Sequence, residues 1–235
     1  RLEGVEDDFE TALNLDQIAR TEDQHFGSQY TLEIGWAATA YGSDRDAAML
    51  RAGASRGFRL GDSRSLFAAG GLTGRIEGGS ARDALISGAL RYYWHTSPRS
   101  TFFASLAGDV GQDLDADHEL VLGGEEGLRG YPLRYQTGSS RALLTIEQRY
   151  YSKYSLWKLA QIGGAVFFDM GRTWGGSALL PTFNLGILKN IGFGLRLGST
   201  RSGLANVLPL DLAFPLAGDS SIDNVQFLVG TKNSF

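Results

Sequence analysis

The stretch NVLPLDLAFPLA at residues 206–217 decides the fold of this chain. Its large apolar residues fall on every second position, and they are Leu208, Leu210, Leu212, Phe214 and Leu216. The residues between them include Pro209, Asp211 and Ala213. A period of two places successive side chains on opposite faces of a β-strand, whereas in a helix it would scatter the apolar groups around the axis. The stretch therefore predicts a strand with one apolar and one polar face.

The same alternation runs through most of the chain. In residues 190–198 the apolar set is Ile191, Phe193, Leu195 and Leu197, and Arg196 falls on the polar face. Earlier segments alternate over 141–151, 159–171, 100–112, 81–95, 64–77, 47–60 and 28–41, and more weakly over 8–20. Most connections are short and rich in Gly, Ser, Asp or Pro, as turns between antiparallel strands are. We expect about eleven or twelve strands in one all-β domain over residues 1–235.

Composition narrows the class of protein. The chain has 235 residues, no cysteine, 32 glycines and a formal charge of −4, so neither disulfides nor nucleic-acid binding is indicated. No apolar run reaches the roughly 20 residues of a membrane helix. A membrane β-barrel escapes such a test, because only alternate residues meet lipid. The first residues lack the apolar region of a signal peptide, so we expect an N-terminal part of the full-length protein to precede them.

Two kinds of barrel fit this alternation. A soluble β-sandwich or lipocalin-like barrel would hold the Leu and Phe set inside. In a transmembrane barrel that set faces lipid, and the polar set lines the lumen. The polar face here is rich in Gly, Ala and Ser with interspersed charge, and the apolar face often ends in aromatic residues such as Trp94, Tyr150 and Trp174. We therefore favour an antiparallel transmembrane β-barrel.

One connection is long, from about Gln112 to Ser139, and it contains GGEEGLRGYP at residues 123–132. Its residues Leu128, Arg129, Gly130 and Tyr131 resemble the loop motif of the bacterial surface antigen superfamily, which is written [V/L/I]-R-G-[F/Y]. Downstream, LLTIEQRYY (143–151) and AVFFDMGRTW (165–174) resemble the two strands that follow this loop in the family. The chain ends in NVQFLVGTKNSF, which resembles the C-terminal signature of outer-membrane barrels and has Phe227, Val229 and Phe235 on the apolar parity.

The resemblance covers roughly residues 100–235, and it has several implications. The superfamily includes the central barrel-assembly subunit, the translocation-assembly protein and the two-partner-secretion transporters. Its barrels have about sixteen strands, an even number as in other bacterial barrels, so this chain would be the C-terminal part of one. The implied function is to assist insertion or translocation of polypeptides at the bacterial outer membrane. The implied partners are outer-membrane lipid, the barrel-assembly machinery that reads the C-terminal signature, and a polypeptide client or an N-terminal domain.

The resemblance also places the long loop inside the lumen, with Arg129 against acidic residues of the wall. The alternation agrees, because Glu147 and Asp169 both fall on the polar parity of their strands. A guanidinium suits this position, since its planar fork can bond a carboxylate twice. Arg149 lies on the same face as Glu147 and could bind that carboxylate instead.

Other readings of the sequence stay open. A passive pore, or a membrane anchor for an N-terminal effector domain, would show the same alternation. Asp113, Asp115, Asp117 and His118 suggest an acidic metal loop, but the glycine and glutamate that a calcium loop needs are missing, so we expect a solvated loop. Neither the three histidines nor any other group predicts catalysis, a cofactor or a metal.

Overall fold

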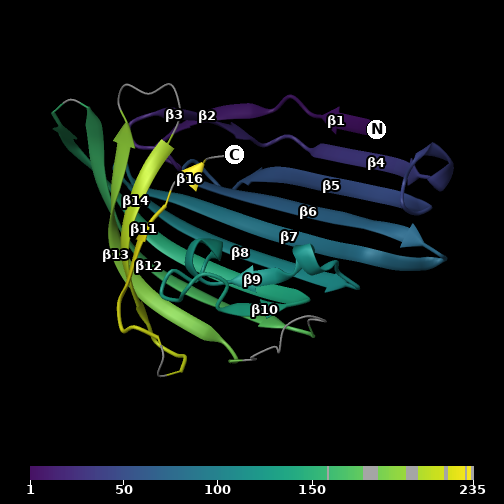
Figure 1. Ribbon diagram of the computed structural model, residues 1–235. Helices are drawn as coiled ribbons and strands as arrows, with labels where there is room; N and C mark the ends of the chain where they lie inside the picture. Colours follow the sequence, from purple (N-terminus) through teal and green to yellow (C-terminus); the bar gives the residue numbers. More distant parts are fainter. Residues whose placement is uncertain (158, 177–184, 200–205, 220–221, 231, 234–235) are drawn as a thin grey trace.

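The computed structural model describes residues 1–157, 159–176, 185–199, 206–219, 222–230 and 232–233. The chain is all-β, and its main element is one large antiparallel sheet in the order β1-β4-β5-β6-β7-β8-β11-β12-β13-β14-β15, with β16 also paired to β14. Figure 1 shows that this sheet is strongly curved. The predicted all-β class is thus observed. Among the described residues β1 and β15 do not pair, so the sheet is open.

Most strands of the main sheet match the alternating segments of the sequence, but the sequence did not predict β1. The bounds of the strands in this sheet are β1 Leu2–Val5, β4 Gln29–Ala37, β5 Ala47–Arg59, β6 Arg64–Glu77, β7 Ser80–Ser97, β8 Ser100–Gln112, β11 Ser140–Leu156, β12 Ala160–Trp174, β13 Leu188–Ser199, β14 Asn206–Pro215, β15 Gln226–Val229 and β16 Lys232–Asn233. Three 3₁₀ turns, η1 Thr39–Tyr41, η2 Ala116–His118 and η3 Gly124–Glu126, are the helical elements of the described part. None of the described helical segments is long and apolar enough to cross a membrane.

The predicted strand over 8–20 is confirmed only over residues 9–13, and these residues do not belong to the main sheet. Residues Phe9–Leu13 (β2) and Thr21–His25 (β3) instead pair with each other in a separate two-stranded sheet. The residues between them include Leu15 and Ile18, which are only 5% and 3% exposed. Both apolar side chains pack inside the molecule, whereas a strand of the main wall would have turned these two positions, three residues apart, to opposite faces. The weak alternation in this segment reflects that different role.

Register fixes which side chains share a face. Glu147 on β11 lies opposite Phe103 on β8 and Phe167 on β12. Asp169 lies opposite Asn190, and Gly194 opposite Asp211. Antiparallel partners directly opposite each other point to the same face. These residues therefore form one continuous surface, which lies on the concave side where the long connection folds in (Figure 1).

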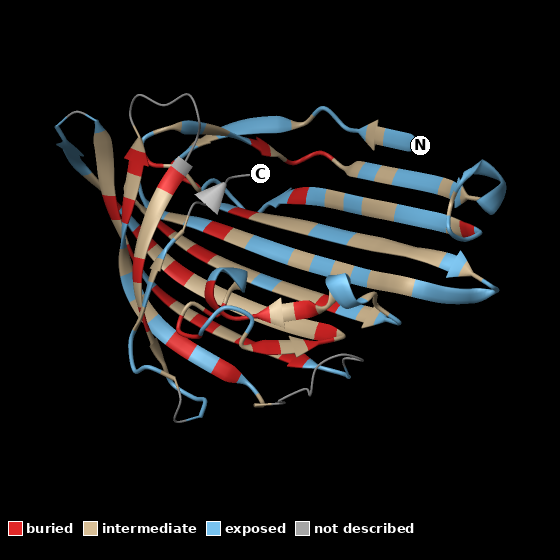
Figure 2. Cartoon of the chain, viewed as in Figure 1, coloured by how far each residue is buried: buried red, intermediate tan, exposed pale blue. Residues whose placement is uncertain are grey.

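Burial is reversed relative to a water-soluble β-sheet. The convex side carries the apolar set, with Ile34 71% and Trp36 69% exposed. The concave side carries buried charges instead, and they are Asp109, Glu147, Arg149, Asp169, Arg196 and Asp211. Figure 2 shows buried residues gathered on β11 to β14 and exposed ones prevalent on β4 to β7.

Two inserted segments supply the buried apolar clusters. The connection between β8 and β11 contains the short strands β9 Leu120–Leu122 and β10 Gln136–Gly138, which pair with each other. It forms a cluster of Leu122, Leu128, Tyr131 and Leu188. The β2–β3 hairpin forms two others, Leu15 with Tyr93 and Phe103, and Ile18 with Tyr151 and Val207. The core of this fold thus lies between the concave wall and what is folded onto it.

Candidate functional site

The candidate site is an ionic cluster on the concave wall, and the loop that reaches it is shaped by two glycines. Gly127 has φ +111°, in the left-handed region, and a Cβ there would collide with the Leu143 side chain. A Cβ on Gly130 would clash with Cβ of Asn190 on β13. Glycine has no Cβ and tolerates both the backbone conformation and the close approach. The two positions that flank Leu128 and Arg129 therefore let the loop press directly onto the wall.

Leu128 and Tyr131 anchor the motif on either side of Arg129. Both are almost fully buried, at 0% and 1% exposure. The Tyr131 hydroxyl lies 2.7 Å from the carbonyl oxygens of Lys189 and Ala217, so it can donate to one of them at a time. It also accepts a hydrogen bond from the Lys189 amide at 3.2 Å. The tyrosine thus ties the loop to the ends of β13 and β14.

Arg129 points into the wall and bonds three carboxylates. Its Nε and Nη2 donate to Oδ2 and Oδ1 of Asp169, each at 2.9 Å, in a bidentate pair. Its Nη1 donates to Glu147 Oε2 and to Asp211 Oδ2, each at 3.1 Å. The guanidinium carbon lies 3.4 Å from the centre of the Phe167 ring, which adds a cation–π contact. The structure therefore brings Arg129 together with both carboxylates expected from the sequence.

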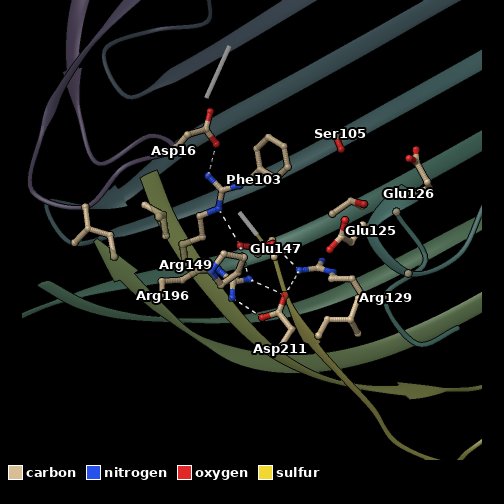
Figure 3. A pocket seen from close by; sticks show the side chains of 18 of the residues that line it. Asp16, Phe103, Ser105, Glu125, Glu126, Arg129, Glu147, Arg149, Arg196 and Asp211 are labelled. Atoms are coloured by element: carbon tan, nitrogen blue, oxygen red, sulfur yellow. Dashed lines mark hydrogen bonds and ion pairs between the residues drawn. The ribbon is translucent and has the colours of Figure 1, made fainter. Parts of the chain in front are cut away.

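Two further arginines complete the cluster. Arg149 Nε and Arg196 Nη2 donate to Glu147 Oε1 at 3.1 and 3.3 Å. Arg196 Nη1 also donates to Asp211. On the other side, Asn190 Nδ2 donates to Asp169 Oδ2 at 2.9 Å. Figure 3 shows the three arginines converging on Glu147 and Asp211 from β11, β13 and the loop.

The cluster alternates in sign and is balanced within the wall and loop. Its three cations, Arg129, Arg149 and Arg196, meet three carboxylates, Glu147, Asp169 and Asp211. Asp169 is 0% exposed and Arg129 15% exposed in their side chains. Charges this far from solvent are tolerated only when each has opposite charges and hydrogen bonds around it. The arrangement can therefore hold the loop in one place.

The sequence could have identified the rest of this cluster only in part. Asp211 and Arg196 fall on the polar faces of their strands, but nothing in their spacing along the sequence predicted that they would join the cluster around Arg129. Arg149 competes for Glu147, as expected, yet shares it with Arg129 instead of displacing it. Asp16 from the β2–β3 hairpin pairs with Arg149 at 3.0 Å, and the strand predicted over 8–20 concealed this partner.

The remaining predicted residues lie elsewhere. Phe227 and Val229 on β15 point outward, at 64% and 51% exposure. Phe235 lies outside the described residues. The acidic loop brings Asp115 and His118 close to Asp83, with donor atoms within 4.8 Å. Arg75 already bonds both oxygens of Asp115, at 2.7 and 2.8 Å, so a guanidinium holds the carboxylate that a metal would need.

The sequence matches no protein-family model, and no curated protein matches it.

The first prediction concerns the Arg129 cluster. Arg129→Ala leaves Asp169 buried without its main counter-charge, and we expect a loss of about 3–5 kcal/mol in unfolding free energy. Arg129→Lys should recover only part of this, because an ammonium cannot bond both oxygens in a plane. Urea unfolding of Arg129→Ala, Asp169→Asn and the double variant measures the coupling between the two side chains.

The matched control is Arg82→Ala. Arg82 and Asp113 form an ion pair in which both side chains are 51% exposed, so its removal should cost less than about 1 kcal/mol. Equal losses for Arg129→Ala and Arg82→Ala would contradict the structural role of the cluster.

The second prediction concerns His118 in the acidic loop. Its Nδ1 lies 2.8 Å from Asp83 Oδ2, and this hydrogen bond raises the pKa of His118 above the ordinary value of 6.5. The contact should therefore stabilise the loop fully below pH 6.5 and weaken as pH rises through the raised pKa. NMR titration should show that Asp83→Asn lowers the pKa of His118; an unchanged titration would exclude the contact.

Proposed function

We propose that this chain forms much of the wall of an outer-membrane β-barrel of the bacterial surface antigen type, and that the barrel assists insertion or translocation of polypeptides. The observation that carries the proposal is the reversed burial of the sheet together with an arginine loop bound inside it. The convex face supports a lipid environment, the edges of the sheet support a larger barrel, and the loop supports the surface antigen type.

The convex face supports a lipid environment. Ile34, Trp36, Ile191 and Phe193 are each at least 46% exposed, and they belong to an apolar set that recurs on successive strands. Water-soluble monomers rarely expose a continuous apolar surface of this kind. Aromatic side chains near strand ends, Trp94, Tyr150 and Trp174, suit the aromatic girdles where lipid meets water. Lipid is the partner that would cover this face.

The edges of the sheet support a larger barrel. In lipid, every backbone N–H and C=O needs a partner within the protein, so a sheet must close. Within the described residues β1 and β15 each have one neighbour in the sheet, β4 and β14. We infer that further strands join these edges and complete a barrel of about sixteen strands, an even number as in other bacterial barrels.

The loop supports the surface antigen type over a passive pore or an anchor. A simple pore needs an open lumen, whereas here Arg129 and its loop are bound deep against β11 to β14. The likeness of the LRGY loop and its two following strands to the superfamily is the reason for assigning the polypeptide-handling function. An outer-membrane location and assembly by the barrel-assembly machinery follow from the same assignment.

The third prediction tests the lipid-facing surface. Spin labels at Ile34 and Trp36 on β4 should collide with oxygen, which concentrates in lipid. Labels at Thr31 and Glu33, on the opposite parity of the same strand, should collide with a water-soluble nickel complex. Electron paramagnetic resonance of the protein in phospholipid vesicles measures both. If the labels at Ile34 and Trp36 collided with oxygen and nickel as often as those at Thr31 and Glu33, the proposal that β4 faces lipid would be refuted.

The fourth prediction tests the function. Vesicles that contain the protein should accelerate the folding of an added, urea-unfolded outer-membrane barrel protein, measured as its heat-resistant band on electrophoresis. Arg129→Ala should reduce this acceleration, and Arg82→Ala should leave it unchanged. Ion conductance without any acceleration of folding would favour the passive pore.

A further inference from the structure

The connection between β2 and β3, residues Asn14–Arg20, is here called the hairpin tip. It is a preformed unit that holds its own shape. The Glu22 carboxylate accepts hydrogen bonds from the amides of Leu15, Asp16 and Gln17, at 2.9, 3.1 and 3.1 Å. Asn14 Oδ1 accepts another from the Ala19 amide at 2.7 Å. The tip can therefore move as one piece together with Glu22 of β3, without losing these hydrogen bonds.

The tip enters the concave face from the end opposite to the LRGY loop. The loop joins β8 and β11 at Gln112 and Ser140, whereas the tip contacts Pro98, Thr101 and Tyr151 near the other ends of these strands. Its strands β2 and β3 are not members of the main sheet. Withdrawal of the tip would therefore break none of the ladder hydrogen bonds within that sheet.

A small set of side-chain contacts holds the tip in place. Leu15 and Ile18 insert into the two apolar clusters at this end of the wall. Asp16 pairs with Arg149 at 3.0 Å and accepts a hydrogen bond from the Tyr93 hydroxyl at 2.9 Å. Arg149 Nη1 also donates to the Leu15 carbonyl at 2.6 Å. Figure 3 shows Asp16 directed at Arg149, which in turn faces Glu147.

The tip separates two cavities, both lined in part by charged side chains. The first, of about 510 Å³, lies between the tip and the LRGY loop and is lined by Arg129, Glu147 and Asp211 among others. The second, of about 570 Å³, lies between the hairpin and β5 to β7 and is lined by Arg56, Phe67 and Arg91 among others. Asp16 lines both cavities. The tip is thus the partition between them.

We propose that the hairpin tip is a retractable plug. When it withdraws, the two cavities join into one water-filled path along the concave wall, open to hydrated ions and small polar solutes. Arg149 then loses Asp16 and keeps Glu147, which it shares with Arg129, so the plug is linked to the LRGY loop through Arg149 and Glu147. The path crosses a membrane only if the proposed barrel is correct, but the motion itself does not depend on lipid.

The chain offers a clean way to lock the plug. It contains no cysteine, so introduced thiols are unique. A Cβ built on Gly198 would lie 3.0 Å from Cβ of Ile18, close to the roughly 3.5–4.5 Å that a disulfide spans. Ile18→Cys with Gly198→Cys should therefore form a disulfide that fixes the tip on β13 after a small adjustment. Failure of this pair to oxidise would contradict the placement of the tip.

The reporter is a third introduced thiol beneath the plug. Thr101 is 0% exposed, and its hydroxyl donates to the Asn14 carbonyl at 3.1 Å. Thr101→Cys should react slowly with a water-soluble maleimide in detergent micelles, as read by peptide mass spectrometry. Asp16→Asn weakens the latch to Arg149 and should speed this labelling about tenfold or more. Oxidation of the Ile18→Cys and Gly198→Cys pair should abolish the increase.

Two controls keep the test decisive. Ser105→Cys, on the same strand and lining the first cavity, should label equally with and without the lock. Tyr93→Phe removes only the hydroxyl that bonds Asp16. It is the second variant to test if Asp16→Asn does not fold. If neither Asp16→Asn, nor Tyr93→Phe, nor the disulfide changes the labelling rate of Thr101→Cys, the proposal that the tip is a retractable plug is contradicted. Loss of folding assistance in vesicles with normal labelling of Thr101→Cys would count against the proposed function alone.

Discussion

The structure depends on the burial of one guanidinium. Arg129 bonds Glu147 on β11, Asp169 on β12 and Asp211 on β14, and so it links three carboxylates that come from three strands. Three buried carboxylates on strands of one sheet are costly without cations between them, and a buried cation is costly without them. The loop and the wall therefore need each other, and the glycines at 127 and 130 provide the close approach that brings them together.

This constraint explains why the core lies on the concave side. When a sheet turns its apolar side chains outward, those side chains cannot pack against other parts of the chain. Its inner face must therefore be stabilised by other interactions. Here these are of two kinds: ion pairs along β11 to β14, and apolar anchors such as Leu128 and Leu15 carried by the two inserted segments. Strands β4 to β7, where less of the concave face is covered, keep fewer buried side chains (Figure 2).

The sequence predicted the strands well because period-two alternation is a local signal. It placed Glu147, Asp169 and Asp211 on one face correctly, since parity follows directly from position along a strand. Local signals could not show that Asp211 and Arg196 join Arg129, because register between strands that are distant in sequence decides this. They also failed at residues 14–20, where Leu15 and Ile18 serve a tip held by Glu22 and Asn14.

The two inserted segments enter from opposite ends and meet through Arg149 and Glu147. Glu147 has only two oxygens, and three arginines from the loop and two strands share them. We therefore expect a change in the partners of Arg149 to alter how strongly Glu147 holds Arg129. Coupling of this kind requires an element with two positions. The β2–β3 hairpin, which stands outside the main sheet, is the element of the described chain best suited to supply it.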